Sequence, residues 1–200
     1  MNVVVTGASG IAGHAVCARL RDRGDTVVAV GTDEARLASV DATDRRVADL
    51  TDPDAVRALA GSVADAHRRV DAVVHLVGGW RAGDSAEADA WLRPRLVDAL
   101  ANVIAAFEGE LASSEGRLAI VSSTAVRPGA TSSYARAKAD AEELVAELSD
   151  RLGAADGAAT VFAIGSLGED GTPAAVLAER LAAWLDAPAA EVNGERIVLA

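Results

Sequence analysis

VVVTGASGIAGHAV, residues 3 to 16, places Gly7, Gly10 and Gly13 between a short apolar run and a stretch of helical period. Glycine at such positions permits a tight turn, a close approach of the backbone to a ligand, and close packing of a helix on a strand. The start of the following helix offers free N–H groups and the positive end of the helix dipole, which favour a phosphate. This position after a strand and before a helix predicts a dinucleotide-binding turn, and a tight turn without a ligand is the alternative.

Outward from this turn, short β-branched runs alternate with longer helical stretches, which is typical of βαβ units around a parallel sheet. We therefore expect an α/β fold: one doubly wound Rossmann domain over residues 1–200, with a mostly parallel sheet of about seven strands and helices on both faces. The expected strands are 2–6, 26–30, 46–48, 71–77, 117–122, 160–164 and 196–199. The expected helices are 11–23, 34–40, 53–68, 86–111, 133–152 and 173–185.

The composition narrows the range of partners. The formal net charge of −11 would repel a polyanion on average, so nucleic acid is not expected. The single cysteine, Cys17, cannot form an intramolecular disulfide, which is typical of a reducing compartment. The N-terminus does not resemble a signal peptide and no apolar run reaches bilayer length, so we expect a cytoplasmic protein without a membrane partner.

SSYARAKADAEEL, residues 132 to 144, holds the only tyrosine, Tyr134, and the only lysine, Lys138, although the chain has 19 Lys and Arg residues in all. Residues four apart share one face of a helix, so the amine would lie beside the phenol. A positive charge there favours phenolate, and we expect the pKa of Tyr134 to fall below its usual value of about 10. Tyr134 would then be a general acid or base for interconverting a carbonyl and an alcohol. A solvent-facing pair on an amphipathic helix is the alternative.

Together with the glycine turn, this pair resembles the short-chain dehydrogenase/reductase family over nearly the whole chain. TGASGIAG is similar to the TGxxGxxG turn, VADLTD to the adenine-side segment, IVSS to the serine strand and YARAK to YxxxK, while HLVGG stands where NNAG is common. The resemblance implies an NAD(P)-dependent oxidoreductase that transfers hydride between a nicotinamide cofactor and a small-molecule carbonyl, alcohol or reducible ring. The family also implies a homodimer or homotetramer formed through the helices at 86–111 and 133–152.

The resemblance assigns roles to individual residues. Tyr134 and Lys138 would be catalytic, with Lys138 also bonding the nicotinamide ribose. Ser123 would orient the substrate oxygen, and Ser122 is the alternative serine. The residues implied to bind the cofactor are Gly7, Ser9, Gly10, Ile11, Gly13, Thr32, Asp49, Leu50, Val77, Gly78, Tyr134 and Lys138.

The chain departs from the family pattern in several places. Counting along the helix puts Asp98 or Asn102 near the position of a family asparagine that supports a water. Gly79-Trp80 resembles the GGW loop of quinoid dihydropteridine reductases, where Trp80 would stack on a flat substrate or pack against its neighbours. His75 is expected to be a strand residue that bonds a neighbouring loop. The connection from the sixth strand to the last long helix is short, so most of a substrate lid is expected to be missing.

The end of the second strand, VVAVGTDEARL, bears on the choice of cofactor. An acid directly at the strand end favours NAD and a nearby arginine favours NADP. Gly31 and Thr32 stand at the strand end, followed by Asp33 and later Arg36, so we expect NAD(P) with a slight preference for NADP. The histidines and the cysteine have no spacing suited to a metal.

Two other functions stay open. A non-catalytic nucleotide-sensing or partner-binding protein is suggested by the short lid. An epimerase or dehydratase with tightly held NAD is suggested by the glycine spacing and by the HLVGG strand end.

Overall fold

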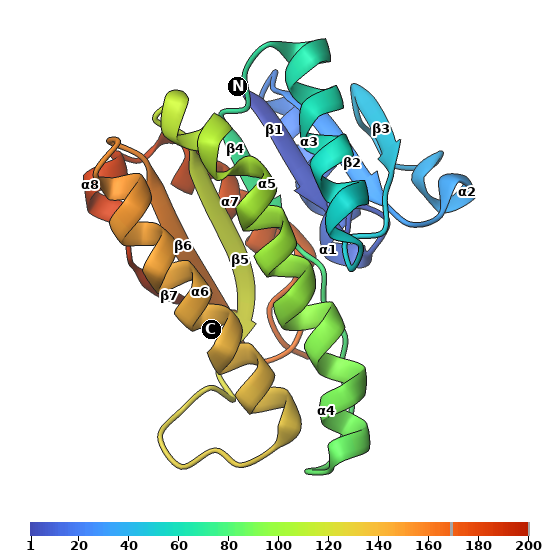
Figure 1. Cartoon of the computed structure of the whole chain (residues 1–200), viewed down its shortest axis with the longest axis vertical. Helices are drawn as coiled ribbons and strands as arrows, with labels where there is room; N and C mark the ends of the chain where they lie inside the picture. The colour runs from blue at the N-terminus through green and yellow to red at the C-terminus, as the bar shows by residue number, and fades with distance from the viewer. Residues whose placement is uncertain (169, 200) are drawn as a thin grey trace.

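Seven strands form one sheet in the order β3-β2-β1-β4-β5-β6-β7, in a computed structural model that describes residues 1–168 and 170–199 (Figure 1). The strands are β1 (Asn2–Thr6), β2 (Thr26–Gly31), β3 (Asp44–Val47), β4 (Ala72–His75), β5 (Arg117–Ser123), β6 (Ala158–Ile164) and β7 (Arg196–Leu199). Each neighbouring pair is parallel. The expected fold class is confirmed.

Helices cover both faces of the sheet, with α3, α5 and α6 on one face and α1 and α7 on the other (Figure 1). The helices are α1 (Ile11–Asp22), α2 (Glu34–Leu37), α3 (Pro53–His67), α4 (Ala86–Arg93), α5 (Ala99–Ser113), α6 (Ser133–Gly153), α7 (Ala174–Asp186) and α8 (Ala189–Val192). The short helix α8 was not expected from the sequence.

The long helix expected over 86–111 is three consecutive pieces in the structure. A π-helical segment, η1 (Pro94–Asp98), joins α4 to α5. Pro94 has no N–H to donate to the preceding turn, and its ring crowds the carbonyl there, so the regular hydrogen-bond ladder is interrupted at this point. Period alone does not reveal such a widened turn, because the apolar spacing continues across it.

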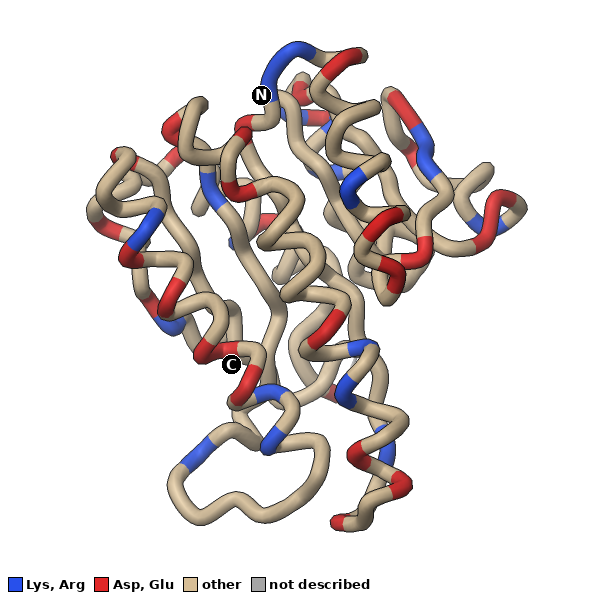
Figure 2. Tube along the Cα trace, viewed as in Figure 1, with Lys and Arg blue, Asp and Glu red and all other residues tan. Residues whose placement is uncertain are grey.

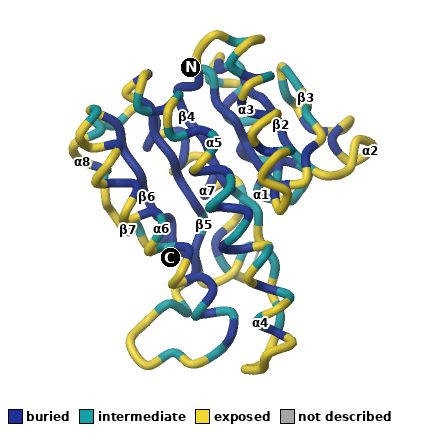
Figure 3. Tube along the Cα trace, in the orientation of Figure 1, coloured by how far each residue is buried: buried dark blue, intermediate teal, exposed yellow. Residues whose placement is uncertain are grey.

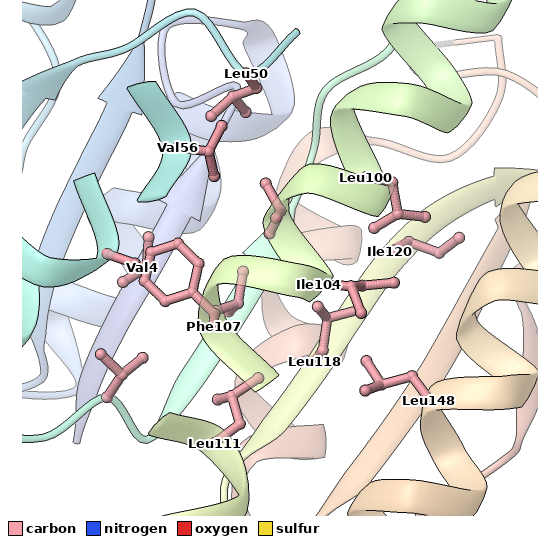
Figure 4. Packing of buried hydrophobic residues seen from close by; sticks show 14 of the residues in the cluster. Val4, Leu50, Val56, Leu100, Ile104, Phe107, Leu111, Leu118, Ile120 and Leu148 are labelled. Atoms are coloured by element: carbon pink, nitrogen blue, oxygen red, sulfur yellow. The ribbon is translucent and has the colours of Figure 1, made fainter. Parts of the chain in front are cut away.

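The alternation of side chains along each strand divides the core into two layers. On β1, Val4 faces the layer under α3 and α5, whereas Val3 and Val5 face the layer under α1 and α7. Figure 4 shows Phe107 of α5 close to Val4 in the first layer. Buried residues run along the central strands and the inward sides of the helices (Figure 3). This double packing makes the sheet a rigid support for the loops at its edge.

The direction of the chain connections creates a crevice at the carboxyl edge of the sheet. β1 lies between β2 and β4, so connections leave it toward opposite sides, which is the topological switch point where ligands bind in such sheets. The N-terminal part of α4 and the loop over 124–132 both extend past the carboxyl end of β5 (Figure 1). The predicted site residues follow strands at this same edge.

Strands β2 and β5 end one residue later than predicted and β6 begins two residues earlier, while β3 and β4 differ more. β4 ends at His75, two residues before the expected end at 77, because Leu76 and Val77 leave the strand to pass beside the glycine turn. β3 covers Asp44–Val47 rather than 46–48, and its side chains alternate between partly buried and exposed, as suits an edge strand.

Acidic and basic residues are interspersed along the surface helices, and α4 carries two acidic residues near its start (Figure 2). Among the described residues, we find no helix whose length and apolar character would let it cross a bilayer.

Candidate active site

The glycine turn between β1 and α1 forms one half of the site. Gly7 has a φ of +70°, and a Cβ on it would lie 2.8 Å from the backbone carbonyl carbon of Leu76, so a larger residue does not fit without a shift. Gly10 is the N-cap of α1, and its amide donates to the Gly7 carbonyl oxygen over 3.1 Å. The first N–H groups of α1 follow directly, which is the arrangement that a pyrophosphate requires.

The other two positions predicted in this turn have different surroundings. A Cβ at Gly13 would lie 2.4 Å from the Ala8 carbonyl oxygen, so Gly13 is needed for close packing of α1 on the turn. It lies outside both cavities described below. The side chain of Ile11 is 74% exposed in the first turn of α1 and also lies outside both cavities.

A cavity of about 590 Å³, which we call the adenosine cavity, lies over the turn at the ends of β1 and β2. Eight of the predicted cofactor-binding residues line it: Gly7, Ser9, Gly10, Thr32, Asp49, Leu50, Val77 and Gly78. Arg36 and Arg95 also line it. The Asp49 carboxylate is already engaged, because it accepts hydrogen bonds from the Thr51 amide and hydroxyl at 2.9 and 2.7 Å. These bonds hold the pKa of Asp49 below its usual range.

The end of β2 presents a hydroxyl and a guanidinium to the adenosine cavity. Thr32 and Arg36 line the cavity, and Arg36 reaches back to donate from Nη2 to the Ser9 carbonyl oxygen over 3.1 Å. Asp33 does not line the cavity; its carboxylate accepts from the Arg36 amide and caps α2. No carboxylate at this strand end therefore faces the place expected for a ribose.

A second cavity of about 830 Å³, the catalytic cavity, lies beyond the ends of β4, β5 and β6. The structure brings together all four predicted catalytic residues in its lining: Ser122, Ser123, Tyr134 and Lys138. The two cavities share the backbone segment Leu76–Val77–Gly78. The two cavities are therefore neighbours, and with the Gly7 cradle that a side chain would fill they fit a ligand as long as a dinucleotide.

The first turns of α6 position the tyrosine and the lysine. Ser132 caps the helix by accepting from the Ala135 amide over 3.2 Å, and Tyr134 and Lys138 follow on one face. The Lys138 side chain is 6% exposed, and its ammonium donates to the Val121 carbonyl oxygen over 2.7 Å. The amine therefore lies against the end of the strand that carries Ser123.

The pKa of Tyr134 is shifted opposite to our expectation. Burial raises the pKa of the phenol, and the neighbouring Ser123 hydroxyl lowers it by less. Burial also lowers the pKa of Lys138 to about 8, while the nearby Glu142 carboxylate acts in the other direction. The lysine does not produce the expected phenolate here, because its ammonium is directed to the Val121 carbonyl and is itself costly to keep charged.

The two candidate serines have different partners. The Ser122 hydroxyl donates to the Glu142 carboxylate over 2.5 Å and is directed toward α6. The Ser123 hydroxyl neighbours the Tyr134 phenol and accepts from the Ala125 amide over 3.1 Å. Of the two, Ser123 is the serine whose hydroxyl stands next to the tyrosine.

Neither candidate for the family asparagine reaches the catalytic cavity. Asn102 donates to the Leu50 carbonyl oxygen over 2.9 Å, and Asp98 pairs with Arg93 at 3.7 Å. The part of α4 and η1 that packs near Tyr134 is apolar instead, in a cluster made of Leu92, Leu96, Val97 and Ala137. On this side, the tyrosine packs against hydrocarbon rather than an amide.

The GGW loop forms one wall of the catalytic cavity. Trp80 lines the cavity while 69% exposed, so its ring stands at the mouth. A Cβ at Gly79 would lie 2.9 Å from the ring of Trp91, and the guanidinium of Arg95 lies 4.4 Å from the centre of that same ring. The loop therefore packs against the Trp91 ring, and Arg95 on that ring also lines the adenosine cavity. Trp80 is not a core residue.

Ion pairs and a backbone hydrogen bond hold the segment after the GGW loop to the start of α6. Arg136 donates from Nη2 to the carboxylates of Asp84 and Asp89 at 2.7 and 2.9 Å. The Ser133 amide donates to the Gly83 carbonyl oxygen over 3.2 Å. These bonds fix the loop next to Tyr134.

The opposite wall confirms the expected short connection after the sixth strand. β6 ends at Ile164 and α7 begins at Ala174. Between them, the Thr172 amide donates to the Ser166 carbonyl oxygen over 2.9 Å, so the connection folds back on itself. Ser166 and Leu167 line the catalytic cavity, and Leu177 of α7 joins them.

His75 is buried at the end of β4 and bonds a neighbouring strand rather than the expected loop. Its Nδ1 lies 2.9 Å from the Thr6 hydroxyl, and its Nε2 has no hydrogen-bond partner in the described chain. Burial lowers the pKa of His75 to about 3, with a smaller contribution from the charge of Lys138. The ring is therefore neutral and has no role in the site as an acid.

Arg95, Glu142 and Arg196 were not singled out from the sequence. No motif marks Arg95 or Arg196, because each reaches the site from an element distant in the chain. Glu142 carried a usable signal, since it stands one helical turn after Lys138 on the same face of α6. Within the described residues, no group of three acidic, histidine or cysteine side chains is placed to hold a metal ion.

Comparison with known proteins identifies the family and supports the fold. The family model described as short chain dehydrogenase matches residues 1–168. No curated protein sequence matches the chain significantly. Among solved structures, a short-chain type dehydrogenase/reductase from Mycobacterium ulcerans has a TM-score of 0.89 at 20% identity, over 99% of this chain and 87% of that one.

Two further structures have the same fold. NAD⁺-bound xylitol dehydrogenase has a TM-score of 0.87 at 15% identity, over 99% of this chain and 96% of that one. A metagenomic short-chain oxidoreductase in complex with NADP has a TM-score of 0.84 at 24% identity, over 100% of this chain and 98% of that one. With the family match over residues 1–168, the chain belongs to the short-chain dehydrogenase family of NAD(P)-dependent oxidoreductases.

Proposed function

We propose that this protein reduces an uncharged carbonyl compound or reducible ring with a nicotinamide cofactor, using Tyr134, Ser123 and Lys138. The observation that carries the proposal is that two neighbouring cavities share the wall at 76–78, with the glycine cradle in one and the three side chains in the other. A bound reduced nicotinamide would supply the hydride to the carbonyl carbon.

Tyr134 is suited to donate the proton in this reaction. Because burial raises the pKa of its phenol, the hydroxyl is protonated near neutral pH and can protonate the substrate oxygen as the carbon receives hydride. The products are the alcohol and a phenolate, which the Ser123 hydroxyl can stabilise by donating to it. Proton uptake from solvent restores the phenol.

Lys138 supplies a positive charge near Tyr134 during this proton transfer. With a pKa of about 8 the amine is mostly protonated at pH 7, so a phenolate formed on Tyr134 would have a cation nearby. In the free protein its proton is directed to the Val121 carbonyl oxygen. When the cofactor is bound, the remaining N–H groups are available to hold the nicotinamide ribose, as family members do.

The lining of the catalytic cavity favours a substrate without charge. Its two cations are already engaged, since Arg81 pairs with Glu87 and Lys138 bonds Val121. The rest is largely hydrocarbon with the exposed ring of Trp80 at the mouth, which suits a flat apolar molecule. A carboxylate in this cavity would lack an unpaired partner and would bind poorly.

We also propose that NADPH binds more tightly than NADH. The support is the end of β2, where Thr32 and Arg36 face the adenosine cavity and Asp33 is committed to capping α2. A guanidinium matches the geometry and charge of a ribose phosphate. Arg36→Gln should weaken NADPH binding about 10- to 100-fold and leave NADH binding nearly unchanged. Arg57→Gln, which removes an exposed guanidinium on α3, should change neither.

The central experiment combines cofactor titration with turnover. Fluorescence titration should show binding of NADPH, and a panel of aromatic and alicyclic ketones and quinonoid rings should be reduced faster than 2-oxo acids of similar size. Tyr134→Phe should lower kcat about 10²- to 10⁴-fold while the dissociation constant for NADPH stays within about threefold. Absence of binding by both cofactors would refute the proposal. Binding without turnover of any substrate would favour the nucleotide-sensing alternative.

A further inference from the structure

The end of β5, where Ser123 stands, is held by three charged side chains in succession. Lys138 donates to the Val121 carbonyl oxygen at 2.7 Å, and Glu142 accepts from the Ser122 hydroxyl at 2.5 Å. Arg196 of β7 donates from Nη2 to the Ser123 carbonyl oxygen over 3.0 Å. Each of three consecutive residues thus has its own charged partner.

Two of these partners also bind each other. Glu142 Oε2 accepts from Arg196 Nε over 2.8 Å, so the carboxylate is held between Ser122 on one side and the guanidinium on the other. The Glu142 side chain is 15% exposed, which leaves little water to compete for it. Charge-assisted bonds of this kind are short and directional, so they fix the backbone that they contact.

The carboxylate also acts on the lysine. Glu142 stands one turn after Lys138 on the same face of α6, and its charge opposes the effect of burial on the amine. Two other ionisable groups lie near Lys138: His75 on β4, on which the lysine charge acts, and Tyr134, one helical turn earlier on α6. His75 is neutral, and Arg196, which bonds Glu142, carries a charge of the same sign as the lysine.

We propose that Glu142 and Arg196 form a positioning pair for the reaction, in which both hold the end of β5 that carries Ser123 and Glu142 keeps Lys138 protonated. This inference rests on the proposed function for its catalytic consequence. It gives a role in the reaction to Glu142 and Arg196, which do not line the catalytic cavity. Its electrostatic part is testable without any substrate.

The test uses the fact that Lys138 is the only lysine in the chain. Protein labelled with ¹³C-lysine gives one set of side-chain NMR signals, and their pH titration reports the pKa of this one amine. Glu142→Gln keeps the shape but removes the charge, so the midpoint should fall by about 0.5 to 1 pH unit. Glu143→Gln makes the same charge change on the neighbouring exposed residue and should leave the midpoint within about 0.2 unit.

Two further variants separate charge from anchoring. Glu142→Asp restores the charge and should bring the midpoint back toward that of the wild type. Arg196→Gln removes a cation, so the midpoint should stay or rise, while the loosened strand end should lower kcat about tenfold with NADPH binding unchanged. Circular dichroism and thermal unfolding of each variant check that the fold is intact.

The outcomes distinguish this inference from the proposed function. If the Lys138 midpoint is the same in Glu142→Gln and in Glu143→Gln, the inference is wrong, whatever activity the variants show. If the lysine midpoint shifts as expected but the wild type neither binds NADPH nor reduces a ketone, the electrostatic part stands and the proposed function fails. If both hold, the basic limb of the kcat profile should move to lower pH in Glu142→Gln alone.

Discussion

The two halves of the site are built by different means. The adenosine cavity depends on backbone: the positive φ of Gly7, the N-terminus of α1 and the passing segment at Leu76. The catalytic cavity depends on side chains from separate elements; Lys138 lines it and His75 lies nearby, and burial lowers the pKa of both. Local backbone geometry forms the first half, whereas the burial of side chains from distant segments sets the properties of the second. Changes in the two halves should therefore have opposite effects on stability.

The largest effect on stability is expected in the backbone half. Gly7→Ala would put a methyl group 2.8 Å from the Leu76 backbone at a φ of +70°. We expect the free energy of unfolding to fall by about 3 kcal/mol and cofactor binding to be lost. Urea unfolding and NADPH titration measure both quantities.

Gly10→Ala is the matched control for this prediction. A methyl group at Gly10 would have its nearest neighbour at 3.4 Å, and the φ of −86° is open to any residue. We expect a loss of about 1 kcal/mol or less. Equal losses for the two alanine variants would contradict the idea that the cradle at Gly7 is the critical point.

The next effect is a gain in stability in the catalytic half. Burial lowers the pKa of Lys138 from 10.5 to about 8, so keeping it charged in the folded state costs about 3 kcal/mol at pH 7. Lys138→Met removes this cost, and loss of the bond to Val121 offsets about 1 kcal/mol. We expect the variant to be about 2 kcal/mol more stable at pH 7 and inactive.

The pH dependence gives the sign of this effect. The cost is fully present below pH 8, where the folded lysine is charged, and disappears as pH rises from about 8 to 10.5, where only the unfolded chain still holds the proton. Urea unfolding at pH 7 and pH 10 should show the advantage of Lys138→Met shrinking. An advantage that persists at pH 10 would point to packing rather than to charge.

The smallest of the three effects is the loss of stability that His75 causes as the pH falls. Its pKa of about 3 in the folded state lies below the unfolded value of 6.5, so the unfolded chain takes up a proton first as pH falls. Stability should drop by roughly 1 to 2 kcal/mol between pH 7 and pH 5 because of this residue. His75→Asn can keep a bond to Thr6 and should lose less stability over that interval. Urea unfolding at several pH values measures this in both proteins. If the free energy of unfolding fell equally with pH in the two, the effect would not come from His75.

Much of the fold could be predicted from short-range patterns. The starts of β1, α1, β2 and α3 were predicted at the residues where they occur, because the apolar period and the caps are local signals. The break at Pro94 was missed, since a π-helical turn preserves the apolar spacing that indicates a helix. The early end of β4 was also missed, because Leu76 and Val77 are as apolar as strand residues and only the neighbouring turn draws them away.

The candidate site divides in the same way. The glycine cradle, the serine strand and the Tyr134–Lys138 spacing were all visible as motifs, and the structure places them along the two neighbouring cavities. The surroundings of these groups were not visible. The upward shift in the pKa of Tyr134 and the apolar cluster that packs beside it each depend on residues distant in the chain.

The amino-acid sequence by itself determined that this chain is an alternating α/β protein with a glycine turn and a tyrosine and lysine one helical turn apart. Those features depend on backbone freedom and helical period, which act over a few residues. Only the tertiary structure decided which groups are charged and what holds them. Burial and approach set the free energy of a proton on Tyr134, Lys138 or His75, and both arise only when distant segments pack together.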